Sequence, residues 1–185
     1  MNKTLFVALI GALMLTNCAT DNAPDPFLVK KNNIGLLTDS TQVKELDAIF
    51  SNDSVVRYIP GSDFIGSVNT IEVYEKGGKK LLDLSPRNAS DSTSVISSVH
   101  IIDERYKTDK DITSLSTFKD IKAAYKISKV DNLINLVVVT VNDINASFTI
   151  DKKELPASMR FDMDMSIDPL QIPEKAKIKY FMIHW

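Results

Sequence analysis

The chain has 185 residues, with 22 basic and 24 acidic side chains and a net charge of −2. Hydrophobic residues make up 44% of it, which is enough for the core of one domain or of two small, closely packed ones. Nucleic-acid-binding proteins need a clustered excess of Lys and Arg, so this near-neutral charge argues against a nucleic-acid partner.

The first 18 residues have the pattern of an export segment. Lys3 precedes an unbroken apolar run at residues 5–15, which is too short to span a bilayer because a transmembrane helix needs about 20 apolar residues. The segment ends at Cys18, the only cysteine of the chain. Residues 1–18 therefore resemble a bacterial lipoprotein signal. Asn17 departs from the usual Gly, Ala or Ser before the cysteine, but it is tolerated in Bacteroidota, which is the lineage we expect.

This resemblance implies that residues 1–17 are a signal peptide and that Cys18 is lipidated. The protein would then be anchored in the cell envelope through this lipid, facing the periplasm or the cell surface, with the outer membrane favoured. The alternative for Cys18 is a buried thiol or half of a disulfide, but the chain offers no second cysteine as a partner. Residues 18–27 are polar and contain Pro24 and Pro26, so they predict a flexible tether.

Residues 28–185 predict an α+β body built from antiparallel sheet and two short helices. Apolar residues recur at helical spacing behind polar caps at residues 41–50 and 117–125. The strands expected after the first helix are 55–59, 70–75, 81–84 and 95–102, and those after the second are 133–141, 147–151, 159–167 and 177–185. The halves 28–106 and 107–185 would each contain one helix and about four strands. This indicates either a tandem duplication or a chance similarity of two amphipathic segments.

Three local patterns refine this expectation. Lys76-Gly77-Gly78-Lys79 predicts a hairpin turn, and the apolar run at residues 137–139 predicts a central strand buried on both sides. The last strand is apolar and ends on Trp185, so we expect it to be tied into the core rather than left as a free edge.

The loop-to-helix entry of the body carries a second resemblance. Gly35-Leu36-Leu37-Thr38 is followed by Val43 and Leu46. This stretch resembles the helix-on-sheet modules of envelope lipoproteins such as the outer-membrane assembly factor of the SmpA type, and of the tandem β-lactamase-inhibitor proteins. The resemblance implies that the exposed face of a sheet binds other proteins, without catalysis.

Searches for catalytic or metal-binding motifs give no strong candidate. His100 and His184 have no second ligand at metal-site spacing, so we expect neither a metal nor another cofactor. A serine nucleophile such as Ser97 or Ser98 with His100 lacks a Gly-x-Ser-x-Gly elbow. Residues 61–66 have the glycine spacing of a phosphate-binding loop, but Ser67 stands where that loop needs a lysine.

Oxygen-rich side chains gather near the C-terminus. Asp162, Asp164, Ser166 and Asp168 alternate with apolar residues, which predicts a strand with one acidic face. A calcium site or a carboxylate pair for glycoside cleavage would need such a cluster, but a solvated strand face is the favoured interpretation. The tripeptides at residues 39–41, 53–55 and 91–93 resemble acceptors for O-glycosylation in Bacteroidota, although each also suits an ordinary cap or turn.

From these observations we expect a non-catalytic envelope lipoprotein that binds another envelope protein or a polymer. Its partners would be the membrane, through the lipid on Cys18, and that protein or polymer. One alternative is an envelope hydrolase that uses dispersed carboxylates or a hidden serine. Another is an inhibitor or an immunity-type lipoprotein.

Overall fold

The computed structural model describes residues 25–57, 70–162 and 165–185. Cys18, the signal segment and the glycine-bearing stretch 61–66 lie outside these residues. In the described part the fold is α+β, as predicted, with two short α-helices and mostly antiparallel sheet.

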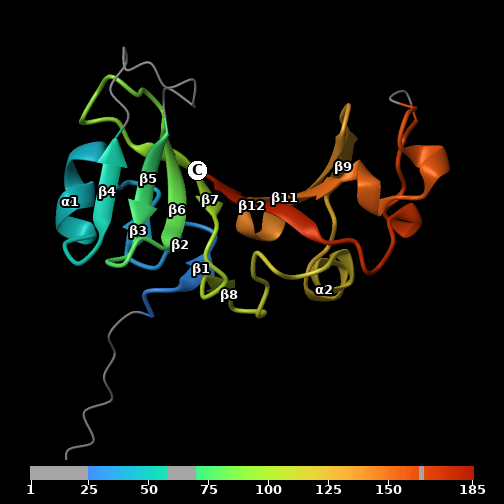
Figure 1. Ribbon diagram of the computed structural model, residues 1–185, viewed down its shortest axis with the longest axis horizontal. Coiled ribbons are helices and arrows are strands. Elements are labelled where there is room, and N and C mark those ends of the chain that lie inside the picture. Colours follow the sequence, from blue (N-terminus) through green and yellow to red (C-terminus); the bar gives the residue numbers. More distant parts are fainter. Residues whose placement is uncertain (1–24, 58–69, 163–164) are drawn as a thin grey trace, which may run out of the picture.

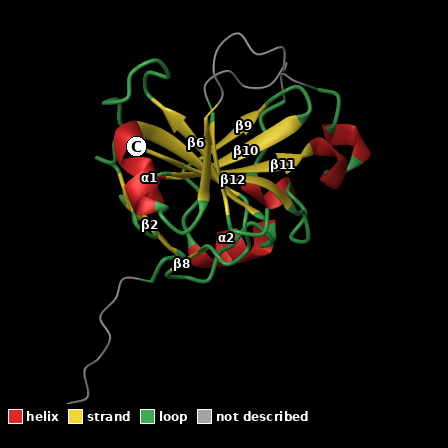
Figure 2. Ribbon diagram, turned by 60° about the vertical axis from the view of Figure 1, so that its left-hand side comes forward, coloured by secondary structure: helices red, strands yellow, loops and turns green. Residues whose placement is uncertain are grey.

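The largest element is an eight-stranded sheet in which every neighbouring pair is antiparallel (Figure 1). Its strands, in spatial order, are β4 (Ser54–Arg57), β5 (Ile71–Tyr74), β6 (Lys80–Pro86), β7 (Ile96–Ile101), β12 (Ile178–His184), β11 (Ala146–Asp151), β10 (Leu136–Val141) and β9 (Lys129–Asn132). The strands fan around one another in Figure 2, as expected from the intrinsic twist of antiparallel strands.

The order of strands shows how the two halves are joined. Four consecutive strands, β4 to β7, form one meander, and β9 to β12 form the other. The last strand of each meander, β7 or β12, pairs with the last strand of the other. Each meander follows one helix, so each half contains one helix and four strands, and the two halves share one continuous sheet. Whether they arose by tandem duplication stays a prediction.

A helical segment covers the sheet in each half. The first consists of the 3-10 turn η1 (Val43–Glu45) and α1 (Leu46–Ile49), and the second is α2 (Phe118–Ala124). Thr117 begins α2 with a capping box, in which its backbone N–H donates to Asp120 Oδ2 at 2.8 Å. Its hydroxyl also donates to Asp120 Oδ2 at 2.8 Å. Buried apolar side chains form the inner stripe of both, at Val43, Leu46, Phe118 and Ile121. Both predicted helices are therefore confirmed, although α1 is only one turn long.

A small second sheet lies beside the first half. Its order is β3 (Leu37–Thr38), β2 (Asn33–Ile34), β1 (Leu28–Lys30) and β8 (Lys107–Thr108), and β1 and β8 run parallel. Gly35 makes the turn between β2 and β3 with a φ of +56°. A Cβ atom there would lie 2.0 Å from the carbonyl oxygen of Pro26, so glycine is required both by conformation and by space.

One row of apolar residues shows where the core lies. Paired positions place one such residue in each of the eight strands, so the row crosses the whole sheet on a single face. The row is Val55, Val73, Leu82, Ile101, Phe181, Phe148, Val139 and Val130. Residues of α1, α2 and the small sheet belong to the same buried cluster. These elements therefore cover this face of the sheet.

The turn and the C-terminal strand agree with the prediction. Gly77 and Gly78 have positive φ angles of 114° and 91° and close the hairpin between β5 and β6. β12 lies at the centre of the sheet between β7 and β11, and both Phe181 and Ile183 are fully buried. The last strand is thus tied into the core on both sides.

One strand prediction in the second half is wrong, and one strand was missed. The stretch 159–167 forms no strand in its described part: η4 (Ala157–Met159) is a 3-10 turn, and Phe161, on the predicted apolar face, is 89% exposed. Asn132 of β9 binds this stretch through its side chain, donating to the carbonyls of Asp162 and Met165, in place of a backbone ladder. The edge strand β9 itself was not predicted.

The expectation for residues 137–139 also fails. Val137 and Val139 are fully buried, but Val138 is only half-buried on the opposite face. β10 is the second strand from the edge, not a central strand with both faces covered.

The remaining regular elements are short 3-10 turns: η2 (Asn142–Ile144), η3 (Lys152–Glu154) and η5 (Pro169–Gln171). Within the described residues, every helix is too short or too polar to cross a membrane.

Candidate functional site: the open face of the sheet

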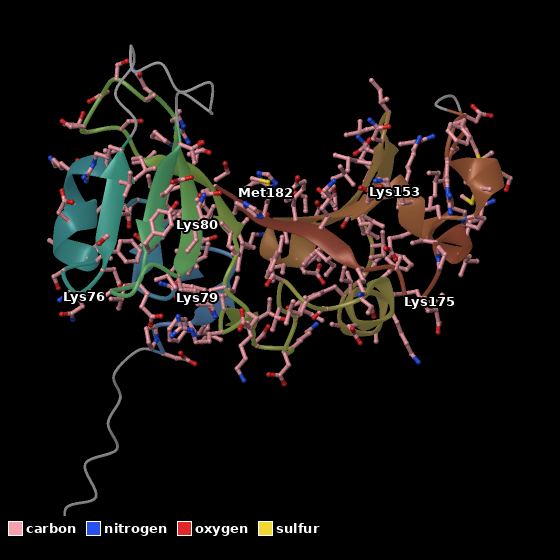
Figure 3. All side chains as sticks on the ribbon, viewed as in Figure 1. Lys76, Lys79, Lys80, Lys153, Lys175 and Met182 are labelled. Carbon is pink, nitrogen blue, oxygen red and sulfur yellow. The ribbon has the colours of Figure 1, made fainter. Side chains whose placement is uncertain are left out.

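The face of the eight-stranded sheet opposite the core carries the candidate site, and we call it the open face. Strand pairing defines it by a second row, displaced by one residue from the core row. This row is Val56, Glu72, Asp83, His100, Met182, Ser147, Thr140 and Lys129. Each of these side chains is half-buried or exposed. Met182 lies in the middle of the molecule, between the two halves (Figure 3).

Charged side chains on β5, β6 and β7 form a network on the first half of the open face. Lys80 forms ion pairs with Glu72 and, at 2.7 Å, with Asp83. His100 Nδ1 lies 3.4 Å from the other oxygen of Asp83. The Tyr74 hydroxyl donates to Glu72 at 2.7 Å. The alternation of the strands brings these groups together, because each lies one residue away from a core position.

The network changes the ionisation of its members. Burial alone would raise the pKa of Asp83, but hydrogen bonds from His100 and Lys80 hold it below its ordinary value. Burial alone would lower the pKa of Lys80, but its bonds to Asp83 and Glu72 raise it. Asp83 and Lys80 therefore stay charged at neutral pH and form an ion pair, which is typical of a structural or binding surface.

Aromatic and aliphatic groups continue the open face across the junction. The ring of Tyr180 meets that of His100 edge to face, with centroids 5.3 Å apart, and Tyr180 is 38% exposed. Half-buried Met182 and Val138 carry this surface on toward β10. The open face thus mixes apolar, aromatic and charged groups, which is the composition of many protein-binding surfaces.

Ser147 and His184 form a pair that sequence inspection did not find. The Ser147 hydroxyl lies 2.7 Å from His184 Nε2, and the two residues are 37 positions apart in the chain. Burial lowers the pKa of His184, which favours the neutral imidazole that a general base requires. In the described part of the chain no carboxylate is bound to the other nitrogen of His184, so the third member of a triad is missing.

The structure does not bring together the serine and histidine side chains that the sequence suggested as a nucleophile and its base. Ser97 donates its hydroxyl to the carbonyl of Ser85 at 2.9 Å, and His100 is occupied by Asp83, so these groups form no nucleophile and base pair. Ser98 lies opposite His184 in the sheet.

The acidic alternation near the C-terminus does not become a cluster of carboxylates. Asp168 caps η5 by accepting from the backbone N–H of Leu170 at 2.7 Å, and Asp162 Oδ1 accepts from that of Met165 at 3.1 Å. Asp164 lies outside the described residues. Over the described ranges no group of three potential metal ligands occurs. Asp162 and Asp168 accept hydrogen bonds from the backbone of their own turns, so the predicted acidic strand face is wrong.

The three tripeptides that resemble glycosylation acceptors each present an exposed serine. Ser40 lies in the loop before η1, Ser54 begins the edge strand β4, and Ser92 lies in the connection before β7. Attachment of a glycan requires this exposure, and the modification itself remains a prediction.

Comparison with known proteins gives a fold and no function. No family model and no curated protein matches the sequence. The crystal structure of the uncharacterized protein yfeY from Escherichia coli is similar, with a TM-score of 0.53 at 12% sequence identity. The similarity covers 85% of this chain and 99% of that one. The arrangement of strands and helices described above is therefore shared with a natural protein of nearly the same extent.

Proposed function

We propose that this protein is a non-catalytic envelope lipoprotein, anchored through a lipid on Cys18, whose open face binds another envelope protein or polymer. One observation carries the proposal. In the described part of the chain, α1, α2 and the small sheet contribute to the core on one face of the eight-stranded sheet, whereas the row from Val56 to Lys129 on the other face is half-buried or exposed. A broad surface of mixed polar and aromatic character suits contact with an extended partner.

The pattern of contacts on the open face supports binding over catalysis. Glu72, Lys80, Asp83 and His100 are engaged with one another, so they can be presented as a fixed arrangement of charge at low entropic cost. Tyr180 lies beside them, and its side chain is amphipathic with few rotatable bonds. Tyrosine is enriched among the interface residues that contribute most of the binding energy.

Substitution of Tyr180 tests the binding proposal. The Tyr180→Glu variant introduces a charge on the open face, and we expect it to lose the partner that the lipidated wild-type protein retains from the native envelope. Leu170→Glu is the matched control, because Leu170 is 82% exposed and lies in η5. Equal recovery of the partner by both variants, with unchanged thermal unfolding, would exclude the open face as its binding site.

The Ser147 and His184 pair supports one alternative, an envelope hydrolase. In such an enzyme His184 Nε2 would accept the Ser147 hydroxyl proton as the oxygen attacks an acyl carbon. A fluorophosphonate probe tests this directly. Covalent labelling that Ser147→Ala abolishes would favour the hydrolase, and no labelling at millimolar probe would favour the binding module.

A further inference from the structure

One pocket of the molecule is lined mainly by positively charged side chains. A pocket of about 630 Å³ lies where the turn between β9 and β10, the end of β11 and the segment after η4 come together. We call it the cationic pocket, because Lys152, Lys153, Arg160 and Lys179 line it. Its volume is in the range of sites that hold small molecules.

The charge of this pocket is only partly compensated by the protein. Among the described residues that line it, Asp151 is the one acidic residue, and it pairs with Lys179 at 3.0 Å. Within the described part of the chain, Lys152, Lys153 and Arg160 form no ion pair with a carboxylate. Three like charges in one hollow repel one another, so an anion bound among them would be stabilised by all three.

Lys152 is the least expected member of the group. It is 3% exposed, and its Nζ atom is buried with no hydrogen-bond partner. A buried ammonium without a partner is strongly destabilising, since neither water nor a counter-charge replaces its hydration. Its backbone is fixed at the end of β11, where Lys152 N–H donates to the carbonyl of Asn135 at 3.0 Å. The position therefore places a buried amine without a partner among the residues that line the cationic pocket.

Arg160 is oriented without being neutralised. Its Nε donates to the carbonyl of Leu155 at 2.8 Å, and its Nη2 donates to the carbonyl of Lys153 at 3.0 Å. These carbonyls carry no net charge, so the guanidinium stays positive while its orientation is set. A pre-oriented guanidinium is the preferred protein group for phosphate recognition.

Apolar side chains line the same pocket. Phe161 is 89% exposed and Ile134 is 68% exposed. Large apolar groups at a pocket lined by cations favour a ligand that carries both a negative group and a hydrocarbon or ring portion.

We propose that the cationic pocket binds a phosphate ester with an apolar substituent. The phosphate lies among Lys152, Lys153 and Arg160, and the substituent lies against Phe161 and Ile134. The site is on the second half of the sheet and does not depend on the proposed role of the open face. A membrane phospholipid and a soluble phosphorylated compound could both supply this chemistry, and the probes test the phosphate and the apolar portion that the two share.

Calorimetric titration of the mature protein with three probes tests the proposal. Dihexanoylphosphatidic acid has both the phosphate and the apolar chains, inorganic phosphate has the anion alone, and dihexanoylphosphatidylcholine has the same chains with no net charge. We expect saturable binding of phosphatidic acid, at least tenfold tighter than either of the others, and weakening with added salt. Equal affinity for inorganic phosphate would contradict the apolar contact and favour a soluble anion. Equal affinity for phosphatidylcholine would contradict the role of the cations.

Substitution of Lys152 separates binding from structure. Lys152→Met removes the buried charge and keeps the length of the side chain, so we expect unchanged or higher thermal stability together with at least tenfold weaker phosphatidic acid binding. Lys175→Met makes the same change at an exposed lysine outside the pocket (Figure 3) and should alter the affinity less than twofold. Unchanged affinity in Lys152→Met would overturn the proposal.

Two exposed positions keep the test valid if Lys152→Met does not fold. Lys153→Met and Phe161→Ala lie on the surface of the pocket and should fold normally. Each should weaken phosphatidic acid binding, the first with a reduced salt dependence and the second without such a reduction. Wild-type affinity in both variants would reject the site.

Discussion

Met182 of β12 lies directly opposite His100 of β7, and this pair marks the line where the two halves of the sheet meet. On the other face, Phe181 is opposite Ile101 at the same junction and stacks on Phe148, with ring centroids 4.7 Å apart and an interplanar angle of 25°. The open face is continuous across the halves because this buried contact holds them in one sheet.

Truncation of the junction core should strongly destabilise the protein. Phe181 and Phe148 are both fully buried, so Phe181→Ala removes a stacked ring and leaves a cavity. We expect a loss of about 3–5 kcal/mol of unfolding free energy in urea titration. Phe161→Ala is the same substitution at an 89% exposed position and should cost less than about 0.5 kcal/mol. Similar losses in both variants would contradict the packing described for the junction.

Asp103 should make the stability sensitive to acid. Its side chain has no exposed surface, and burial alone would raise its pKa, but bonds from Arg105 and Lys79 lower it to about 2. A carboxylate with a lower pKa in the folded state stabilises the fold above the unfolded value, near 3.8, and this contribution is lost as the pH falls toward 2.

The variant Asp103→Asn measures this contribution. At pH 7 it should be less stable than wild type by about 2 kcal/mol, because it loses charge-assisted hydrogen bonds. Between pH 4 and pH 2 the difference should shrink, since wild-type Asp103 becomes protonated there. The exposed substitution Asp143→Asn should leave the urea midpoint nearly unchanged. A difference between wild type and Asp103→Asn that stays constant from pH 7 to pH 2 would disprove the assignment.

Gly35 should be intolerant of any side chain. A left-handed alanine costs about 1–2 kcal/mol, and in Gly35→Ala the new Cβ must also displace the carbonyl of Pro26, 2.0 Å away. Gly78→Ala bears only the conformational cost, because nothing lies within 4 Å of its Cβ position. We therefore expect Gly35→Ala to be the less stable by at least about 1 kcal/mol and to be cut faster near residue 26 by proteases. Equal stability would show that the chain at Pro26 is not held against this turn.

The anchor proposal predicts a chemical difference at Cys18. The protein from native membranes should partition into detergent, and its N-terminal peptide should begin at Cys18 with an added lipid mass. Cys18→Ala should remain unlipidated and leave the membrane fraction. An intact residue 1–17 segment in the mature wild-type protein would refute the lipoprotein interpretation.

The fold was predictable where the signal is local. The helical stripe of Phe118 and Ile121 and the turn at Gly77 and Gly78 are set by nearest neighbours in sequence, and both predictions hold. The pairing of β7 with β12 was not predictable. The alternation of apolar and polar residues identifies a strand, but it does not show which other strand pairs with it. Residues 159–167 alternate well, but their described part forms no strand, and Asn132 binds it through its side chain.

The candidate sites were harder to predict from the sequence than the fold was. The network of Glu72, Asp83 and His100 depends on strand register, and a partial signal was present in their alternation with buried residues. Lys152 follows a strand as an ordinary charged residue, and only the packing around it shows that its charge is buried.

Site-specific photocrosslinking in intact cells tests the central claim most directly. A photoreactive phenylalanine replaces Tyr180 on the open face or, as the control, Leu115, which is 74% exposed in the connection before α2. If the open face binds an envelope partner, light should yield a discrete adduct from position 180 and none from position 115. Adducts from position 115 alone, or from neither position with both proteins at wild-type abundance, would contradict binding through the open face.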